Sequence, residues 1–457
     1  MKNIITKSKS FILIRIIFIT ILLLHSIQNT FAQNVINVFH SGGTGDDYGK
    51  EIAYKDDGRY YLTGNFNSTA NIFGETLSSQ NPNFDDIFIS CFDTSGQNIF
   101  TKSIGSMKDD IARGIAIDST GRTYVTGTFN DSLQFADTTI YNPCGNSPNS
   151  GKGIFLIKYS PQGNRLWEKV VCGTKTTANS KVLLDPFGKV WLIGNYENGG
   201  VLIDTLNLSG SGNTNIFIAR FTKNGNLEFA NGISASGSGP SQCLLTGITV
   251  NNQGAVFISG YYKYANHING FSVPDGSYYK PFIMKMDYSG NIQWVSGSSS
   301  NNNCYSKGFI NDISGNSYIT GYFQGTTTFG SQTIASNGGY DYFIACCSSS
   351  GQWQWAESVG NTGNDYAFGI SLNSQNELFI TGRFENSLSF AGQNLISNGG
   401  TDIFLAKYDL AGGFLAAQSY GGSADDGAYN VYITENDTII ITGYFQNTMT
   451  IDTITTT

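Results

Sequence analysis

The chain has 457 residues, with 55 glycines, 13% aromatic residues, only 13% charged residues and a formal net charge of −8. An acidic chain repels phosphate backbones, so nucleic acid is excluded as an expected partner. Abundant glycine and aromatic residues with so few charges are typical of an all-β, turn-rich protein and not of a disordered polyelectrolyte.

The first 32 residues have the pattern of a signal peptide. Three lysines supply the positive start: Lys2, Lys7 and Lys9. An apolar run over 11–24 and the small residues of 30–32 follow, which predicts cleavage before Gln33. We therefore expect export to the periplasm, the cell surface or the extracellular space. No later stretch reaches the 18 or so apolar residues of a membrane-spanning helix, so no anchor is expected after cleavage.

Removing these 32 residues takes away four positive charges and no acids, which leaves 22 Lys and Arg against 34 Asp and Glu. The mature chain would then carry about −12, which suits solubility and binding of cations or basic partners.

A six-residue motif of the type Tyr-Ile-Thr-Gly-Tyr-Phe recurs seven times after this segment. Its copies lie at 61–66, 124–129, 191–196, 257–262, 318–323, 379–384 and 440–445. The seven motif glycines are separated by 63, 67, 66, 61, 61 and 61 residues. A period of this length indicates one supersecondary unit repeated along the chain, here numbered repeat 1 to repeat 7.

Each repeat reads as four strands, A to D, as repeat 2 illustrates. Strand A is the apolar segment 114–117, a tight turn follows over 118–121, and strand B is the motif itself. Strand B leads through a connection with its own short hairpin pattern to strand C at 153–156, and strand D carries Trp167. The motif glycine marks a position with no room for a side chain, and the aromatic residue two positions on fills the space between sheets.

Four-stranded units joined by tight turns are typical of β-propeller blades. A β-solenoid needs far shorter repeats, and separate β-sandwiches of about 60 residues would each bury too little core. The predicted fold is therefore all-β: one seven-bladed β-propeller of four-stranded blades over 33–457, closed into a ring by the N-terminal strand.

The segment 114–127 resembles the repeat signature of the bacterial seven-bladed β-propeller repeat (SBBP) family, and 402–409 is similar to the second half of that unit. The resemblance extends over nearly the whole mature chain and implies an exported bacterial propeller. It implies no catalytic residues and no defined ligand. Repeat 3 departs most from the pattern, with Ile193 at the threonine position of the motif.

Strand direction places the short A–B and C–D turns on one face of such a ring and the longer B–C and D–A connections on the other. We expect ligands on the B–C/D–A face, because loops on a rigid scaffold commonly carry binding sites. The D–A connections carry recurrent acids: Asp46, Asp47, Asp109, Asp110, Asp365, Asp425 and Asp426. They are candidate Ca²⁺ ligands, or they cap backbone N–H groups where the chain crosses between blades; the second interpretation is favoured. No other cofactor is predicted.

Four loop aromatics of repeat 4 are candidates for binding a glycan: Tyr261, Tyr264, Tyr278 and Tyr279. The favoured function is a secreted or surface-displayed binding module for a protein or glycan ligand. Two alternatives stay open: a carbohydrate-active enzyme that uses loop carboxylates, and a purely structural surface or adhesin component. Enzymatic activity is not expected, because only His40 and His267 survive signal removal and neither occurs in a triad-like pattern.

Seven cysteines, an odd number, leave at least one without an intramolecular partner. We expect at most one bridge among two pairs, Cys144 with Cys172 and Cys243 with Cys304. The adjacent Cys346 and Cys347 point to opposite faces of a strand, so no bond between them is expected.

The two ends of the chain are expected to meet in repeat 7. Residues 34–41 match a strand D with no A, B or C before it, and they would complete repeat 7, which supplies strands A and B. The tail 449–457 aligns with the hairpin that follows strand B elsewhere, so strand C is missing. Two solutions are open: the natural protein continues past Thr457 with a strand C, which we favour, or the tail itself takes the C position.

Overall fold

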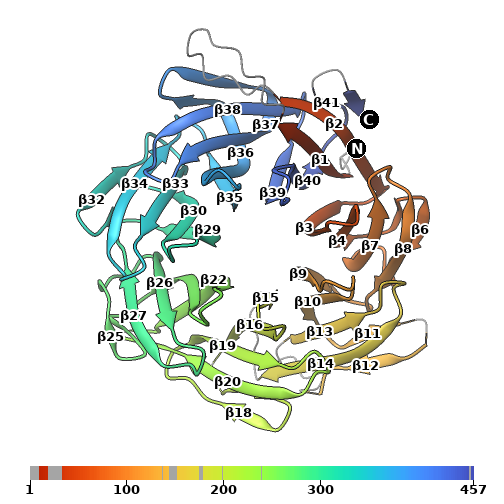
Figure 1. The fold of residues 1–457 in the computed structure, drawn as a ribbon, viewed down its shortest axis with the longest axis horizontal. Helices are drawn as coiled ribbons and strands as arrows, with labels where there is room; N and C mark the ends of the chain where they lie inside the picture. The colour runs from red at the N-terminus through yellow and green to blue at the C-terminus, as the bar shows by residue number, and fades with distance from the viewer. Residues whose placement is uncertain are drawn as a thin grey trace, which may run out of the picture.

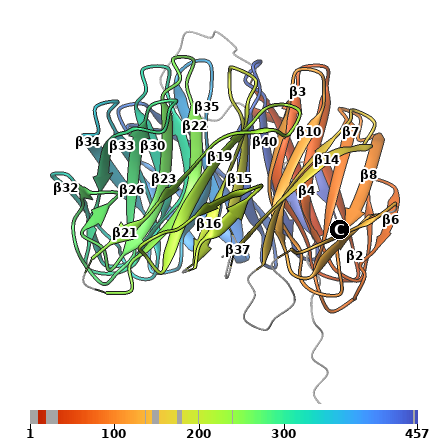
Figure 2. The same cartoon turned by 90° about the horizontal axis from the view of Figure 1, so that it is seen from below.

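The computed structural model describes residues 10–18, 33–135, 137–143, 152–173, 179–197, 199–237, 239–451 and 454–456. Every helix or strand assigned in these residues is a β-strand, which confirms the all-β prediction. The sheets are arranged around a common centre, as in a β-propeller (Figure 1). In the side view their strands run from one face of the ring to the other (Figure 2). Within the described residues, no helix has the length and apolar character needed to cross a bilayer.

The strands of every repeat pair in the antiparallel order A–B–C–D, with A innermost in the ring (Figure 1). The A strands are β3 (Asp47–Lys55), β9 (Ile111–Ile117), β15 (Ser180–Leu184), β22 (Gln242–Val250), β29 (Cys304–Asn311), β35 (Tyr366–Leu372) and β39 (Gly427–Ile433). The B strands, which carry the motif, are β4 (Arg59–Phe66), β10 (Thr123–Phe129), β16 (Val190–Glu197), β23 (Val256–Lys263), β30 (Ser317–Phe323), β36 (Glu377–Phe390) and β40 (Ile439–Phe445).

The outer half of each sheet follows the same order. The C strands are β7 (Asp86–Asp93), β13 (Gly153–Tyr159), β19 (Thr214–Phe221), β26 (Lys280–Met286), β33 (Asp341–Cys347), β37 (Gln393–Asp409) and β1 (Ser10–Phe18). The D strands are β8 (Asn98–Ile104), β14 (Arg165–Gly173), β20 (Leu227–Ile233), β27 (Ile292–Gly297), β34 (Trp353–Val359), β38 (Phe414–Gly422) and β2 (Gln33–Gly43).

The predicted short hairpin follows strand B in the repeats and links them to their neighbours. The hairpins are β5 (Thr69–Ile72) with β6 (Glu75–Ser78), β11 (Ser132–Gln134) with β12 (Thr139–Tyr141), β17 (Val201–Ile203) with β18 (Leu206–Leu208), β24 (His267–Ile268) with β25 (Phe271–Ser272), β31 (Thr326–Phe329) with β32 (Gln332–Ala335), and β41 (Met449–Ile451) with β42 (Ile454–Thr456). In repeat 6 the hairpin is part of β36 and β37. Hairpins pair with the outer edge of the preceding repeat: β17 with β14, for example, and β24 and β31 with the two-residue strands β21 (Ala235–Ser236) and β28 (Ser299–Ser300).

Repeat 7 takes its two outer strands from the start of the chain. β1 pairs antiparallel with both β40 and β2, so it occupies the C position. β2 pairs in turn with hairpin strand β5 of repeat 1, with Gly42 opposite Asn71. The strand at the C position therefore comes from the segment predicted to be a signal peptide.

The alternative in which the C-terminal tail takes the C position is wrong. Strands β41 and β42 form a hairpin that pairs with β38 of repeat 6, with Gly421 opposite Thr450. The physical reason is that the tail has the length and position of the hairpin after strand B. It therefore pairs with the outer strand of the preceding repeat, as the equivalent hairpins do.

The core lies between neighbouring sheets and is filled by the motif aromatics. These side chains are all buried, at 0–2% exposure: Phe66, Phe129, Tyr196, Tyr262, Phe323, Phe384 and Phe445. Phe129, for example, packs in one cluster with Ile89 of repeat 1 and Ile157 of its own repeat. Burying an aromatic side chain of this size contributes about 1.5–3 kcal/mol, so the repeated aromatic stabilises each contact between sheets.

The predicted turn chemistry is confirmed in the A–B turn of repeat 2. The Oδ1 atom of Asp118 accepts the backbone N–H groups of Thr120 and Arg122, at 2.9 and 3.0 Å. Gly121 has a φ of +81°, a conformation that favours glycine.

Candidate functional site

A cavity of about 430 Å³ lies at the centre of the ring, lined by residues from all seven A strands. Neighbouring A strands contact one another around it. We call it the central cavity. Its volume is within the range of cavities that hold small ligands.

A β-bulge recurs at one level of the A strands and projects a side chain into this cavity. In six repeats the A–B ladder skips one residue of strand A at the same point. The skipped residues, called the bulge residues below, are Lys50, Arg113, Thr246, Lys307, Phe368 and Tyr429, and all of them line the central cavity. In repeat 3, β15 pairs with β16 without a skip. Bulges remove a residue from the ladder and re-aim its side chain, which explains the ring of inward-facing residues.

In the bulged repeats, the backbone of strand A leaves no room for a side chain at the motif glycine. A Cβ on Gly321 would lie 1.9 Å from the backbone oxygen of Tyr305, two residues before the bulge residue of that strand. The corresponding distance is 1.8–2.2 Å in every bulged repeat. At Gly194 of repeat 3, which has no bulge, the nearest atoms are the side-chain ends of Phe217 and Ile154. The prediction that this position has no room for a side chain is confirmed, and the obstacle in the bulged repeats is the strand A backbone.

Two of the bulge residues, Arg113 and Lys307, are cations with no carboxylate beside them among the described residues. Nε of Arg113 is buried without a hydrogen-bond partner, and burial lowers the pKa of its guanidinium. Burial lowers the pKa of Lys307 to about 8, and the Arg113 charge lowers it further in the same direction. No acid contributes to either shift. The pair is thus a concentration of positive charge in a partly dehydrated space.

The single carboxylate lining the cavity is already neutralised. Oε2 of Glu51 is 2.5 Å from Nζ of Lys181, and Oε1 accepts a hydrogen bond of 2.6 Å from Nδ2 of Asn430. Lys50, Arg113, Lys181 and Lys307 against Glu51 give the lining a formal charge of 4 − 1 = +3. The carboxylate of Asp85 acts electrostatically on Lys50 and offsets part of this charge at one side. The cavity is therefore positive within an acidic chain.

Aromatic rings form an arc over repeats 4 to 7 and repeat 1, and three of them, Tyr261, Phe368 and Tyr429, line the cavity. Consecutive ring centroids are 4.8–6.2 Å apart. The aromatic arc consists of Tyr279, Tyr261, Tyr305, Tyr322, Tyr366, Phe368, Tyr429, Tyr444 and Tyr48. Several of its members lie two residues before a bulge residue, as Tyr305 does before Lys307. The arc thus extends from the cavity towards the B–C/D–A face, where binding was predicted.

Of the four predicted tyrosines, the structure brings two into this arc. The ring of Tyr261 contacts those of Tyr279 and Tyr305, with centroids 5.3 and 5.4 Å away. Tyr278 is exposed, and Tyr264 has a φ of +52° and lies beside Lys263 in the loop. Sequence reasoning missed Arg113, Lys307 and the other bulge residues. The one signal for them is the extra residue that six A strands carry relative to repeat 3.

The predicted metal candidates are not among the residues that line the central cavity. Four of them, called the second aspartates because each follows an Asp or Asn, are fully buried: Asp47, Asp110, Asp365 and Asp426. They accept backbone N–H groups, such as Gly43 N–H at 2.7 Å from Asp47 Oδ2 and Gly422 N–H at 2.6 Å from Asp426 Oδ2. Asp109 and Asp425 accept the N–H groups of Asp85 and Thr401, and Asp46 accepts the Tyr48 hydroxyl at 3.4 Å. Among the described residues, no three His, Cys, Asp or Glu side chains are grouped as metal ligands would be.

Burial raises the pKa of these second aspartates. The values are about 8 for Asp47 and Asp110 and about 7 for Asp365 and Asp426. Backbone hydrogen bonds lower each pKa but do not outweigh desolvation. Their geometry is that of the capping interpretation.

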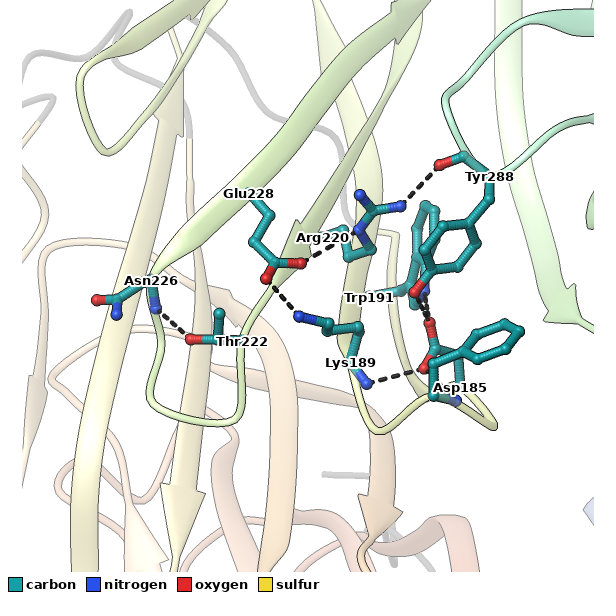
Figure 3. Close-up of polar contacts among 9 residues, drawn as sticks. Asp185, Lys189, Trp191, Arg220, Thr222, Asn226, Glu228 and Tyr288 are labelled. Atoms are coloured by element: carbon teal, nitrogen blue, oxygen red, sulfur yellow. Dashed lines mark hydrogen bonds and ion pairs between the residues drawn. The ribbon is translucent and has the colours of Figure 1, made fainter. Parts of the chain in front are cut away.

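A second cluster of charges, between repeats 3 and 4, contrasts with the cavity because its members are paired (Figure 3). Buried Asp185 accepts the Trp191 indole N–H at 2.8 Å and the Tyr288 hydroxyl at 2.6 Å. Arg220 donates to the Tyr288 carbonyl oxygen at 2.7 Å and lies 3.5 Å from Glu228. The cluster fastens the A–B turn of repeat 3 to the C–D turn of repeat 4, on the face opposite the predicted site.

The remaining predicted residues lie away from the central cavity. His40 is exposed beside Phe445, and Nδ1 of His267 contacts the amide oxygen of Asn266. Cys243 and Cys304 have free buried thiols, so that bridge is excluded, and Cys346 and Cys347 are free as expected. Cys172 is in a disulfide. Cys144, its predicted partner, lies outside the described residues.

Comparison with known proteins assigns the chain to no specific family. No family model matches the chain, so the SBBP resemblance is not confirmed. An uncharacterised WD repeat-containing protein, L264 of Acanthamoeba polyphaga mimivirus, is 23% identical over 79% of this chain, which spans only 31% of that protein. One similar solved structure is the WD40 domain of Neurospora crassa Pan2, which is 7% identical, with 87% of this chain and 89% of that chain covered and a TM-score of 0.45. Another is Sqt1 from Chaetomium thermophilum, which is 10% identical, with 88% of this chain and 96% of that chain covered and a TM-score of 0.41.

Proposed function

We propose that this chain is an exported binding module that takes an anionic ligand in the central cavity, from the B–C/D–A face of a seven-bladed propeller of four-stranded blades. The observation that carries the proposal is the pair Arg113 and Lys307. Both cations face the cavity, and neither has a carboxylate neighbour. A rigid ring with such a pair at its centre is a preorganised anion receptor.

Energetics favour this function over a purely structural one. Holding a cation in a partly dehydrated site without a counter-charge costs free energy, which an anionic ligand offsets on binding. Charge-assisted hydrogen bonds from guanidinium and ammonium groups to an oxyanion are about twice as strong as neutral ones. By contrast, Arg220 in Figure 3 has Glu228 beside it and needs no ligand.

Binding is favoured over catalysis by loop carboxylates. Glu51, the acid of the cavity lining, is held by Lys181 and Asn430, and the second aspartates of the D–A connections are buried against backbone N–H groups. A general acid or base needs access to its substrate, which these groups lack. A secreted or surface location rests on the predicted signal peptide over 1–32.

Export with signal cleavage conflicts with the position of β1 in the sheet of repeat 7. Cleavage before Gln33 would remove β1 and leave the C position between β40 and β2 to another strand. Mass spectrometry of the protein secreted by a bacterial host gives its first residue. A first residue at Gln33 supports export with cleavage, and an uncleaved cytoplasmic product contradicts it.

The anion site is tested on the purified full chain with citrate as the probe, by isothermal titration calorimetry at constant ionic strength. We expect saturable binding that falls at least tenfold in Lys307→Met and in Arg113→Met. Lys102→Met, on the exposed face of outer strand β8, is the matched control and should bind as the parent does. Equal binding in all four proteins, or none in the parent, refutes the proposal.

A further inference from the structure

The ligand class can be narrowed by what surrounds the two cations. Nζ of Lys307 lies 5.3–5.7 Å from the ring centroids of Tyr261, Tyr305 and Tyr322. Arg113 of repeat 2 interacts electrostatically with Tyr261 of repeat 4. An oxyanion that pairs with these cations is therefore in contact with the aromatic arc at the same time. Such a site suits a molecule that has both a negative group and a ring with apolar C–H faces.

We propose that the ligand is an acidic saccharide, whose carboxylate pairs with Arg113 and Lys307 and whose sugar ring lies on the aromatic arc. This inference rests on the proposed function and specifies its ligand. Pyranose rings present C–H groups on their faces and hydroxyls around their edges, so they combine with aromatic faces and hydrogen-bonding groups together.

The arc supplies hydrogen-bonding groups at its edges. The hydroxyls of Tyr305, Tyr322, Tyr366 and Tyr429 form no hydrogen bond with the described residues. Burial raises the pKa of Tyr305 to about 12, so its hydroxyl is protonated at neutral pH and can both donate and accept. Sugar hydroxyls need such two-way partners. A small inorganic anion would use the cations and leave the arc without a contact.

The number of cations in the cavity sets the charge that a ligand can pair with there. A uronic acid chain carries one carboxylate per sugar ring, so a short segment brings one or a few charges into the cavity. The site has two cations without acids, which matches one or two carboxylates. The cavity of about 430 Å³ accommodates a short segment of such a chain.

Calorimetry on the full chain with three probes tests the inference: trigalacturonate, its fully methyl-esterified form and citrate. We expect trigalacturonate to bind at least tenfold more tightly than both others. Tyr305→Leu should lower trigalacturonate affinity at least tenfold and leave citrate affinity unchanged. Tyr141→Leu, at an exposed site on hairpin strand β12, is the matched control. If Tyr305→Leu does not fold, Tyr305→Phe, which removes only the hydroxyl, should weaken trigalacturonate two- to fivefold.

Each outcome has one meaning. Citrate binding as tightly as trigalacturonate overturns the saccharide inference and leaves the anion site standing. Equal binding of the esterified trimer also overturns the inference, because the carboxylates would then be irrelevant. Absence of binding by both citrate and trigalacturonate overturns the inference together with the proposed function.

Discussion

Nζ of Lys181 in repeat 3 lies 2.5 Å from Oε2 of Glu51 in repeat 1, so one ion pair spans the intervening repeat at the wall of the central cavity. Glu51→Gln would retain a hydrogen-bonding oxygen for Asn430 and release the Lys181 charge into the cavity. We expect citrate to bind about two- to tenfold more tightly, because the formal charge of the lining rises from +3 to +4. Stability should fall by less than about 1 kcal/mol, since the pair is partly exposed. Calorimetry and thermal melting measure both effects, with Asp57→Asn on the surface as control. Unchanged or weaker citrate binding contradicts this electrostatic account.

Anion binding should depend on pH through Lys307. Burial and the Arg113 charge lower the pKa of this amine to about 8, so it is charged at pH 7 and mostly neutral at pH 9.5. Citrate affinity should therefore fall across that interval, by roughly tenfold. Lys307→Arg keeps its charge throughout and should flatten the profile. Citrate titrations of both proteins from pH 6.5 to 9.5 at fixed ionic strength measure this pH dependence of the affinity. An equally steep fall in Lys307→Arg would show that another group is responsible.

Replacing the motif glycine should destabilise the fold most in the repeats whose strand A has a bulge. A Cβ at Gly321 meets a backbone oxygen at 1.9 Å, which only a shift of the strand can relieve. Gly321→Ala should destabilise the fold by more than about 2 kcal/mol. Gly194→Ala, in the repeat without a bulge, meets only side-chain ends at 2.7 Å or more and should cost less. Urea unfolding of the two variants makes the comparison. Equal losses would mean that the bulge does not impose the glycine.

The buried aspartates should make the fold less stable as the pH rises. Burial raises the pKa of Asp110 to about 8, so the folded protein favours the protonated carboxyl. This contribution is fully present below the unfolded value of 3.8 and is lost as the pH rises through 8. Each such group adds a slope of up to about 1.4 kcal/mol per pH unit. Asp110→Asn should flatten the decline of the melting temperature between pH 5 and 9. Asp57→Asn should leave that decline unchanged, and a parent-like slope in Asp110→Asn refutes the assignment.

Much of the architecture follows from the sequence because local rules repeat. The period of the motif, its buried aromatic and the Asp-Gly turns each depend on short-range geometry that recurs in every repeat. Phe129 and Gly121 were assigned correctly for this reason.

The site was harder to predict because it depends on a shift of one residue in the ladder. Arg113 and Lys307 look like ordinary surface cations in the sequence, and only the bulge turns them inwards. Tyr261 and Tyr279 were singled out as loop aromatics, which is wrong for Tyr261, because it is a buried residue of strand β23. Their partner Tyr305 comes from the next repeat. The C position of repeat 7 was missed because its strand is hundreds of residues distant from β40 in the chain.

On each bulged A strand, the residue that lines the cavity is distinct from the residues that hold the sheet together. A bulge residue has no ladder partner and no place between the sheets, so replacing it changes the cavity without disturbing the hydrogen bonds that hold the sheet. Substitutions at these six positions would therefore change the chemistry of the cavity one residue at a time while the fold stays the same. A designer could exchange Lys50, Arg113 or Lys307 for acids and obtain a receptor for cations from the same ring.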